Sequence, residues 1–403
     1  MNKYQVRGFQ FSGISAGIKQ TNKPDLALIY SEVPALVVGS FTTSKVQAAP
    51  VKISRRNIRS GMCRAVIVNS GNANACTGQQ GLKNAEAMVR ETARLLKISQ
   101  NQVLVSSTGK IGVPLPMNKI LKKIPEAVKH LSINNFEKSA EAILTTDHSP
   151  KIAIRYGRLN GKSYTVAGFA KGAGMIEPHM KVEKGKHATM LAYLMTDIAI
   201  DPKLLQIIFE NCVEETFNRV TVDGDMSTND TALILANGLA GNKLFRPKTP
   251  ECRQFANHVY EIMGHLSREM VRDGEGATKC VRIEVKGAKN NEDAKRMAYT
   301  VANSPLVKTA FFGQDPNWGR IMGALGRSKV FLDPERVDIF YDRVCVARNG
   351  IATGPSQDKK AKKVMQKKEF TVTIDIHLGH GSFGVYASDL TLDYVKLNSC
   401  YRT

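Results

Sequence analysis

The sequence predicts a mixed α/β chain in which helices flank stacked β-sheets. Short runs rich in β-branched and aromatic residues alternate with longer segments whose apolar residues recur every three to four positions. Such alternation is typical of layered sheets and helices. No repeat of fixed period interrupts the pattern over the 403 residues.

Each segment is assigned from its periodicity. The segments with helical spacing are 83–98, 116–131, 135–144, 202–217 and 252–271. The strand-like segments are 63–69, 151–157, 163–169, 280–287, 336–342 and 369–376. The lysine-rich stretch 354–368 indicates a solvated, charged helix or loop, and 385–395 reads as extended.

The chain is strongly basic, with 57 Lys and Arg against 36 Asp and Glu and a net charge of +21. A basic RNA-binding protein is therefore one alternative. The lysines are dispersed, however, and no aromatic RNA-binding pattern or zinc finger accompanies them. We expect a solvated basic surface that attracts carboxylate substrates, and no nucleic-acid partner.

Cysteine usage and apolar runs predict a cytoplasmic protein. The seven cysteines are scattered without paired spacing, which argues for reduced thiols. The apolar stretches are shorter than a bilayer span, so we expect no membrane association. His377 and His380 lie three positions apart with no further cluster of ligand-type residues nearby, and no metal site is expected. No bound cofactor is expected either.

The most informative segment runs from Lys171 to Asp197. It leads through a glycine-rich turn and a basic stretch to Ala188 and Thr189, followed by an apolar run. If the Ala188–Thr189 bond breaks, the free α-amine of Thr189 can take the proton from its own hydroxyl and make it a nucleophile. On spacing alone, the alternative is that Thr189 caps a helix whose buried face comprises Leu191, Leu194, Met195 and Ile198.

Several ordered blocks give the chain a family resemblance. They are FTTSKVQAAP (41–50), VNSGNANACTG (68–78), SSTGKIG (106–112), LTTD (144–147), TVDGDMSTNDT (221–231), DGEGATK (273–279), ANSPLVKTAFFGQDPNWGR (302–320) and SDLTLDYVKLNSCYRT (388–403). Together with the Thr189 segment they resemble the ornithine acetyltransferase family, the glutamate N-acetyltransferases of arginine biosynthesis. One departure is KVEKGKH at 181–187, an insertion directly before the Ala-Thr pair.

The resemblance implies a fold and a chain organisation. The fold would be similar to, but distinct from, that of N-terminal-nucleophile hydrolases. Self-cleavage would leave residues 1–188 as an α chain and 189–403 as a β chain, associated as a heterotetramer of two α and two β chains. Whether the insertion at 181–187 slows or blocks this cleavage is left open.

The resemblance also assigns site residues. The Thr108 hydroxyl and the Gly109 backbone N–H match the family's oxyanion pair, although from the residues alone Ser-Ser-Thr-Gly after a strand is a plain turn. Five further positions match substrate contacts together with Thr189: one of Thr145 and Thr146, and Lys171, Glu275, Asn398 and Thr403. Lys171 would anchor a carboxylate and Glu275 the distal ammonium of ornithine.

The implied reaction moves acetyl from N-acetylornithine to glutamate through an acetyl-threonine, by a ping-pong mechanism. Some family members also accept acetyl-coenzyme A as donor, and the residues leave that choice open here. An N-terminal-nucleophile amidase or aminopeptidase would use the same Thr189 chemistry with water as the acceptor, and it is the main enzymatic alternative.

Overall fold

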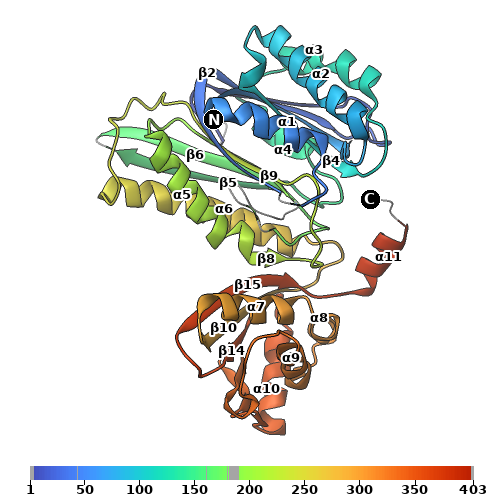
Figure 1. Ribbon diagram of the computed structural model, residues 1–403, viewed down its shortest axis with the longest axis vertical. Coiled ribbons are helices and arrows are strands. Elements are labelled where there is room, and N and C mark those ends of the chain that lie inside the picture. Colours follow the sequence, from blue (N-terminus) through green and yellow to red (C-terminus); the bar gives the residue numbers. More distant parts are fainter. Residues whose placement is uncertain (1–3, 43, 160, 179, 181–189, 401–403) are drawn as a thin grey trace. The chain divides into compact units, whose positions relative to one another are not determined.

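The computed structural model describes residues 4–42, 44–159, 161–178, 180 and 190–400. The described chain forms two compact units. The first is built mainly from Met1–Asn218 and Met226–Ser267, and the second from Arg219–Asp225 and Arg268–Tyr401. Each unit has its own sheet and its own helices (Figure 1).

The first unit contains eight of the described strands and six helices. The strands are β1 (Phe9–Ile14), β2 (Leu26–Phe41), β3 (Met62–Asn72), β4 (Val103–Lys110), β5 (Lys151–Leu159), β6 (Lys162–Lys171), β7 (Leu191–Thr196) and β9 (Thr231–Ala236), with β8 (Val220–Thr221) lying in the second unit's segment. The helices are α1 (Ala49–Asn57), α2 (Gly78–Leu96), α3 (Met117–Lys129), α4 (Phe136–Ala142), α5 (Pro202–Glu215) and α6 (Pro250–Arg272), whose last residues belong to the second unit. Short 3-10 turns follow at Ile58–Ser60, Gln100–Gln102 and Phe217–Arg219.

All eight described strands of the first unit form one sheet, and β8 pairs only in the second sheet. Their order is β4-β3-β2-β9-β7-β6-β5, with β1 also paired to β2. Most neighbours are antiparallel, but β3 with β4 and β7 with β9 run parallel. Two of these strands end at predicted site residues, since Thr108 and Gly109 lie near the end of β4 and Lys171 is the last residue of β6.

The two faces of this sheet bury different side chains, as the alternation along β2 shows. Leu26 and Leu28 pack with residues of α2 and α3, whereas Ala27 and Ile29 pack in a separate cluster with Phe136 of α4. Figure 1 shows α1, α2 and α3 on one side of the blue strands. Burial of apolar area on both faces is the main stabilising contribution to such a layered unit.

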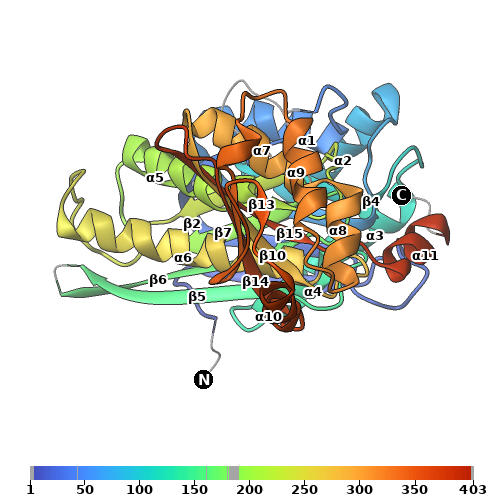
Figure 2. The same cartoon turned by 90° about the horizontal axis from the view of Figure 1, so that it is seen from below.

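The second unit has a seven-stranded mixed sheet in the order β13-β12-β11-β14-β10-β15-β8. Its further strands are β10 (Cys280–Ala288), β11 (Asp338–Tyr341), β12 (Val344–Arg348), β13 (Ile351–Ala352), β14 (Glu369–Asp375) and β15 (Gly381–Ser388). Its helices are α7 (Asn291–Ala302), α8 (Pro305–Phe312), α9 (Trp318–Gly326), α10 (Pro355–Met365) and α11 (Leu392–Cys400), with a 3-10 turn at Pro334–Arg336. Helices α7 to α10 supply apolar side chains to one core with β10, β11, β14 and β15. The ribbons of these helices lie close to the strands of this sheet in Figure 2.

The structure confirms the mixed α/β class and the main elements expected from periodicity. The five helical segments correspond to α2 to α6, and the six strand-like segments to β3, β5, β6, β10, β11 and β14. The lysine-rich stretch contains helix α10. Among the described helices, none is both long enough and apolar enough to cross a membrane.

Two expectations from the sequence are wrong. The apolar run after Thr189 is the strand β7, not a helix, and all six of its residues are buried. A strand that is covered on both faces has a continuous run of apolar residues. Periodicity alone does not distinguish such a run from a buried helix. The segment 385–395 is extended only as far as Ser388, because α11 begins at Leu392.

Candidate acyl-transfer site

The site in the first unit is organised around the buried lysine at the end of β6. Lys171 is only 4% exposed, and its ammonium donates a long hydrogen bond, 3.5 Å, to Oγ1 of Thr108 on β4. Lysine donates but never accepts, so Thr108 is the acceptor here. The hydroxyl hydrogen of Thr108 therefore remains available to donate to an oxyanion.

The carboxylate of Asp147 fixes the position of Lys171. Its oxygens lie 3.7 Å from Nζ of Lys171 and 2.7 Å from Nζ of Lys151. The backbone N–H of Gly172 donates to it at 2.7 Å. Burial alone would raise the pKa of Asp147, but the charges of Lys171 and Lys151 and the two hydrogen bonds outweigh burial and hold the pKa below its usual range. Asp147 is thus ionised at neutral pH and balances buried positive charge.

Gly109 follows Thr108 where β4 passes very close to β3. Its φ is +126°, and a Cβ there would lie 2.4 Å from the carbonyl carbon of Gly71. Residues with a side chain rarely adopt this conformation, and the space is also closed to them. The pairing of β3 and β4 is irregular at the same point, between Gly71 and Asn72. The Ser-Ser-Thr-Gly segment is therefore the end of a strand with a specialised backbone and not a plain turn.

The predicted nucleophile is followed closely in the sequence by the paired strand β7. Ala188 and Thr189, like the insertion at 181–187, lie outside the described residues. The following residue, Met190, accepts a 2.8 Å hydrogen bond from the backbone N–H of Thr231, and Leu191 pairs with Lys171 across β6 and β7. The strand that begins two residues after Thr189 is thus paired with the strand that ends at Lys171.

The second unit brings together two other predicted substrate residues. Glu275, in the loop between α6 and β10, is 5% exposed and accepts a 2.9 Å hydrogen bond from Nδ2 of Asn398 on α11. Nδ2 of Asn398 also donates to the carbonyl of Tyr394. A nearly buried carboxylate that receives a side-chain amide is a suitable partner for an ammonium group.

The loop that carries Glu275 is fastened directly to the start of the tail helix. Gly276 has a φ of +66°, and a Cβ there would lie 2.3 Å from the backbone nitrogen of Tyr394. Oγ1 of Thr391 donates to the carbonyl of Gly276 at 2.7 Å, and Asp389 accepts from the backbone N–H groups of Thr278 and Lys279. The tail therefore packs against the Glu275 loop. Thr403 lies outside the described residues.

The two threonines of Leu-Thr-Thr-Asp lie in a bend between α4 and β5, and both are partly exposed. The backbone N–H of Thr145 donates to Oδ2 of Asp147 at 3.2 Å. This contact orders the bend beside Lys171. Neither threonine is singled out as the substrate contact, so both stay predictions.

The sequence reasoning missed four charged residues near Lys171. Asp147 and Lys151 form the buried pair described above, and Asp230 is fully buried at the start of β9. The fourth residue is Lys19. Burial lowers the pKa of its ammonium to about 8, and the charge of Asp25 acts in the opposite direction. Asp147 and Asp230 do lie within the family-like blocks 144–147 and 221–231. The sequence does not distinguish them from surface carboxylates, because that distinction depends on burial.

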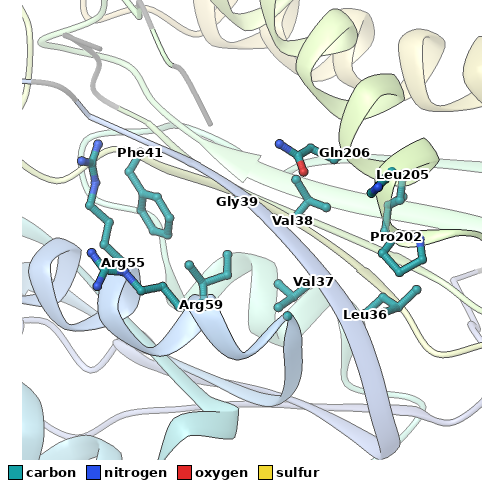
Figure 3. Close-up of a pocket in the computed structure, with 13 residues that line it drawn as sticks. Leu36, Val37, Val38, Gly39, Phe41, Arg55, Arg59, Pro202, Leu205 and Gln206 are labelled. Atoms are coloured by element: carbon teal, nitrogen blue, oxygen red, sulfur yellow. The ribbon is translucent and has the colours of Figure 1, made fainter. Parts of the chain in front are cut away.

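A pocket of about 520 Å³ opens elsewhere in the first unit (Figure 3). It lies between α1 and α5 over part of β2, and Arg55, Arg59 and Lys203 are its charged lining residues. The guanidinium of Arg55 lies 5.6 Å from the centre of the Phe41 ring. None of the site residues predicted from the sequence lines this pocket, so its size alone does not locate the chemistry. Among the described residues, no group of three or more His, Cys, Asp and Glu is arranged to hold a metal ion.

Comparison with known proteins identifies the family. Residues 10–403 match the ArgJ family. The chain belongs to the ArgJ family. It is 50% identical over 398 residues to the arginine biosynthesis bifunctional protein ArgJ of Geobacter sulfurreducens, covering 99% of this chain and 100% of that protein. It is 48% identical to the ArgJ protein of Syntrophotalea carbinolica, again covering 99% of this chain and 100% of the relative.

Two solved ArgJ-type structures are also similar. The ArgJ structure from Bacillus halodurans is 38% identical with a TM-score of 0.51, and it covers 53% of this chain and 100% of its own. The ornithine acetyltransferase from Mycobacterium tuberculosis, solved in complex with ornithine, is 36% identical with a TM-score of 0.40 and covers 45% of this chain and 98% of its own.

Membership in the ArgJ family confirms three predictions made from the sequence. These are the family itself, the acyltransferase class and the place in arginine biosynthesis. It also decides against the two alternatives, a water-dependent amidase and a basic RNA-binding protein. The roles of individual residues remain predictions.

Proposed function

We propose that the chain moves acetyl from N-acetylornithine to glutamate through an acetyl ester on Thr189. The acetyltransferase activity itself follows from the ArgJ family, whose members are bifunctional arginine biosynthesis proteins. The observation that carries the mechanism is the buried contact of Lys171 with Thr108. Lys171 pairs with Leu191, so this contact lies beside the strand that begins two residues after Thr189.

Each predicted site group has a task in the proposed first half-reaction. The Thr189 hydroxyl attacks the acetyl carbonyl and its α-amine accepts the proton. The Thr108 hydroxyl and the Gly109 N–H donate to the oxyanion as it develops. The ammonium of Lys171 keeps the Thr108 oxygen occupied as an acceptor, so that its hydrogen points to the reacting oxygen. Ornithine then leaves, and glutamate takes the acetyl group in the second half-reaction.

Substrate recognition is proposed to use opposite charges. Lys171 attracts the α-carboxylate that N-acetylornithine and glutamate share, while Glu275 binds the distal ammonium of ornithine. Glu275 is nearly buried and accepts a hydrogen bond from Asn398. Both features support a carboxylate that is fixed in position to bind one ammonium group of the substrate. Thr145 or Thr146 and the terminal Thr403 complete the proposed substrate contacts.

Self-cleavage between Ala188 and Thr189 is part of the proposal, because Thr189 needs a free amine. The Bacillus halodurans structure supports it, since a complete chain there corresponds to 53% of this one. That is roughly the share of the sequence that residues 189–403 make up. We propose the assembly of two α and two β chains after cleavage.

The proposal also includes a second acetyl donor and a cellular location. A bifunctional family member acetylates glutamate from another donor as well, and acetyl-coenzyme A is the candidate. The seven cysteines are all free thiols in the structure, which supports a reducing, cytoplasmic location.

Steady-state kinetics test the covalent route. With N-acetylornithine and glutamate varied together, parallel double-reciprocal lines are expected for acetyl-Thr189, and intersecting lines would contradict it. Acetate release without glutamate, at a rate close to that of transfer, would instead favour the amidase chemistry.

A further inference from the structure

The pocket over β2 in the first unit is lined by none of the residues placed in the acyl-transfer site. Its volume of about 520 Å³ lies within the ~300–1,000 Å³ range that is usual for small-molecule pockets. Side chains of β2 and α5 form most of its apolar lining, namely Leu36, Val37, Val38, Phe41, Pro202 and Leu205. The size and the lining therefore suit a small ligand with an apolar part.

The charged side chains that line this pocket are all cationic. Arg55 lies on α1, Arg59 lies in the 3-10 turn that follows α1, and Lys203 lies at the start of α5. Figure 3 shows Arg55 and Arg59 on the opposite side of the pocket from the labelled residues of α5. Among the residues that the structure describes, none of these three cations has an ion-pair partner. The pocket therefore favours an anionic ligand.

Arg55 is a partly buried cation with a donor that is not in use. Its Nη2 donates to the carbonyl of Thr42 at 2.9 Å, and its guanidinium lies 5.6 Å from the centre of the Phe41 ring. Its Nε is buried without a hydrogen-bond partner among the described residues. Burial lowers the pKa of Arg55 because no anion beside it offsets the loss of water.

The acids next to the pocket in the sequence are engaged elsewhere. Oδ1 of Asp201 accepts from the backbone N–H groups of Lys203 and Leu204, at 2.9 and 3.0 Å, and so caps α5. Oε1 of Glu210 accepts from Nε2 of Gln206 at 2.8 Å. Neither acid lines the pocket. The positive charge of the lining is therefore available to a ligand.

The edge of β2 at this pocket has no neighbouring strand among the described residues. The pairing of β3 with this edge ends at Leu36 and Met62, whereas β9 pairs with the other edge as far as Phe41. The carbonyl of Gly61 accepts from the N–H of Val37 at 3.1 Å on the edge that β3 leaves. Gly61 itself lines the pocket, so the unpaired part of the edge begins there.

The backbone of Gly39 points to this unpaired edge. Thr42 and Asp230 lie directly opposite each other, and the N–H of Thr42 donates to the carbonyl of Asp230 at 2.8 Å. In an antiparallel pair the residues that bond across the ladder alternate with residues that bond outward. Gly39 and Phe41 are three and one positions before Thr42, so their N–H and C=O groups point away from β9. Unpaired groups of this kind are a template for further pairing.

These features together specify the ligand chemistry. Two opposite residues of an antiparallel pair exchange two N–H···O bonds, so a partner for Gly39 needs one donor and one acceptor at the spacing of a single residue. An N-acylated amino acid has both, because its amide N–H donates and its α-carboxylate accepts. Carboxylates also form charge-assisted hydrogen bonds with arginine and lysine. A simple anion would use the cations alone and leave the strand edge unpaired.

We propose that this pocket is a second ligand site, which binds an N-acylated acidic amino acid. The N–H of Gly39 donates to the α-carboxylate, and the ligand's amide N–H donates to the carbonyl of Gly39. Arg59 and Lys203 bind the two carboxylates, and the acyl group contacts the apolar lining. The choice of N-acetylglutamate within this class rests on the proposed function, whereas the site itself does not depend on the Thr189 mechanism.

Hydrogen–deuterium exchange of the full protein, followed by mass spectrometry, tests the site locally. N-acetylglutamate is the probe, and the peptide that contains residues 36–42 is the readout. At saturation the exchange of the Gly39 and Phe41 amides should slow by about 10-fold or more. Residues 26–30 of the same strand are paired on both edges, with β1 and β3, so their exchange should not change.

Two arginine variants separate this pocket from other binding sites. Arg59→Gln should raise the N-acetylglutamate concentration needed for half-maximal protection by about 10-fold. Arg56→Gln is the matched control, because it removes the same charge three positions away. Arg56 does not line the pocket, and its guanidinium pairs with Glu86 at 2.8 Å. The control should bind like the wild type.

Three results would overturn the inference. They are no protection in the wild type, equal half-maximal concentrations for Arg59→Gln and Arg56→Gln, and protection by succinate equal to that by N-acetylglutamate. Succinate has two carboxylates but no amide, so equal protection would show that the strand edge is not used. Protection in an enzyme that never forms acetyl-Thr189 would overturn the proposed mechanism and support this site.

Discussion

The ammonium of Lys171 lies 3.5 Å from Oγ1 of Thr108, although four strands separate β6 from β4 in the order of the sheet. The two residues are 63 positions apart in the sequence. Buried cations of this kind need compensation, which Asp147 supplies. The sheet end therefore holds a fixed positive charge beside a hydroxyl whose hydrogen is free to donate.

The first prediction concerns the Thr108 hydroxyl. Thr108→Val keeps the shape of the side chain and removes the donor, so kcat should fall about 100- to 1,000-fold with little change in KM. The matched control is Thr92→Val, because Thr92 is a buried threonine of α2 whose hydroxyl has no partner among the described residues. Equal kcat values for Thr108→Val and the wild type would contradict the oxyanion role.

The second prediction concerns the backbone at Gly109. Gly109→Ala combines a positive φ with a Cβ 2.4 Å from Gly71, so it should lower the free energy of unfolding by about 3 kcal/mol. Gly112→Ala is the comparison, because Gly112 has a φ of +75° but nothing within 4 Å of its Cβ position. It should cost only about 1 kcal/mol. Urea unfolding of both variants measures the difference, and similar losses would contradict the close approach.

The third prediction is a pH dependence of stability that comes from Asp147. Its pKa is depressed in the folded chain, so its contribution is complete above the unfolded pKa of about 3.9 and is lost as pH falls through the folded value. Asp147→Asn should lower the free energy of unfolding by about 3 kcal/mol at pH 7, because two buried lysines lose their counter-charge. The gap between variant and wild type should narrow below about pH 4. Denaturant unfolding across this range tests the prediction, and a gap that widens in acid would contradict it.

The fourth prediction concerns the tail. Deleting Asn398–Thr403 should abolish transfer, since it removes the hydrogen bond from Asn398 to Glu275. The melting temperature should change little, because α11 has no buried residues. Asn398→Ala alone should raise the KM for N-acetylornithine. An active truncated enzyme would show that the tail has no part in the site.

Periodicity predicted the helices and the alternating strands well, but it failed for β7, a strand that is buried on both faces. Residues 191–196 are apolar on both sides, so their pattern fits a strand and a helix equally. The tail helix α11 was missed for the opposite reason. It has no buried face, and hence no apolar stripe to mark it.

The site could be predicted in part because the family resemblance marked individual positions. The resemblance marked Lys171, Thr108, Gly109, Glu275 and Asn398 as predicted site residues. In the structure Lys171 contacts Thr108, and Glu275 contacts Asn398. The charges that support them could not be predicted. Asp147 and Asp230 become significant only through burial, which depends on the pairing of strands distant in the sequence.

The most direct test of the acetyl-threonine mechanism is the intact mass of the wild-type protein incubated with N-acetylornithine alone. The expected result is two fragments, 1–188 and 189–403, with one acetyl group on Thr189 that disappears when glutamate is added. Thr189→Ala should remain uncut and unacetylated. An active wild-type chain that is uncut, or that carries its acetyl group on another residue, would contradict the mechanism.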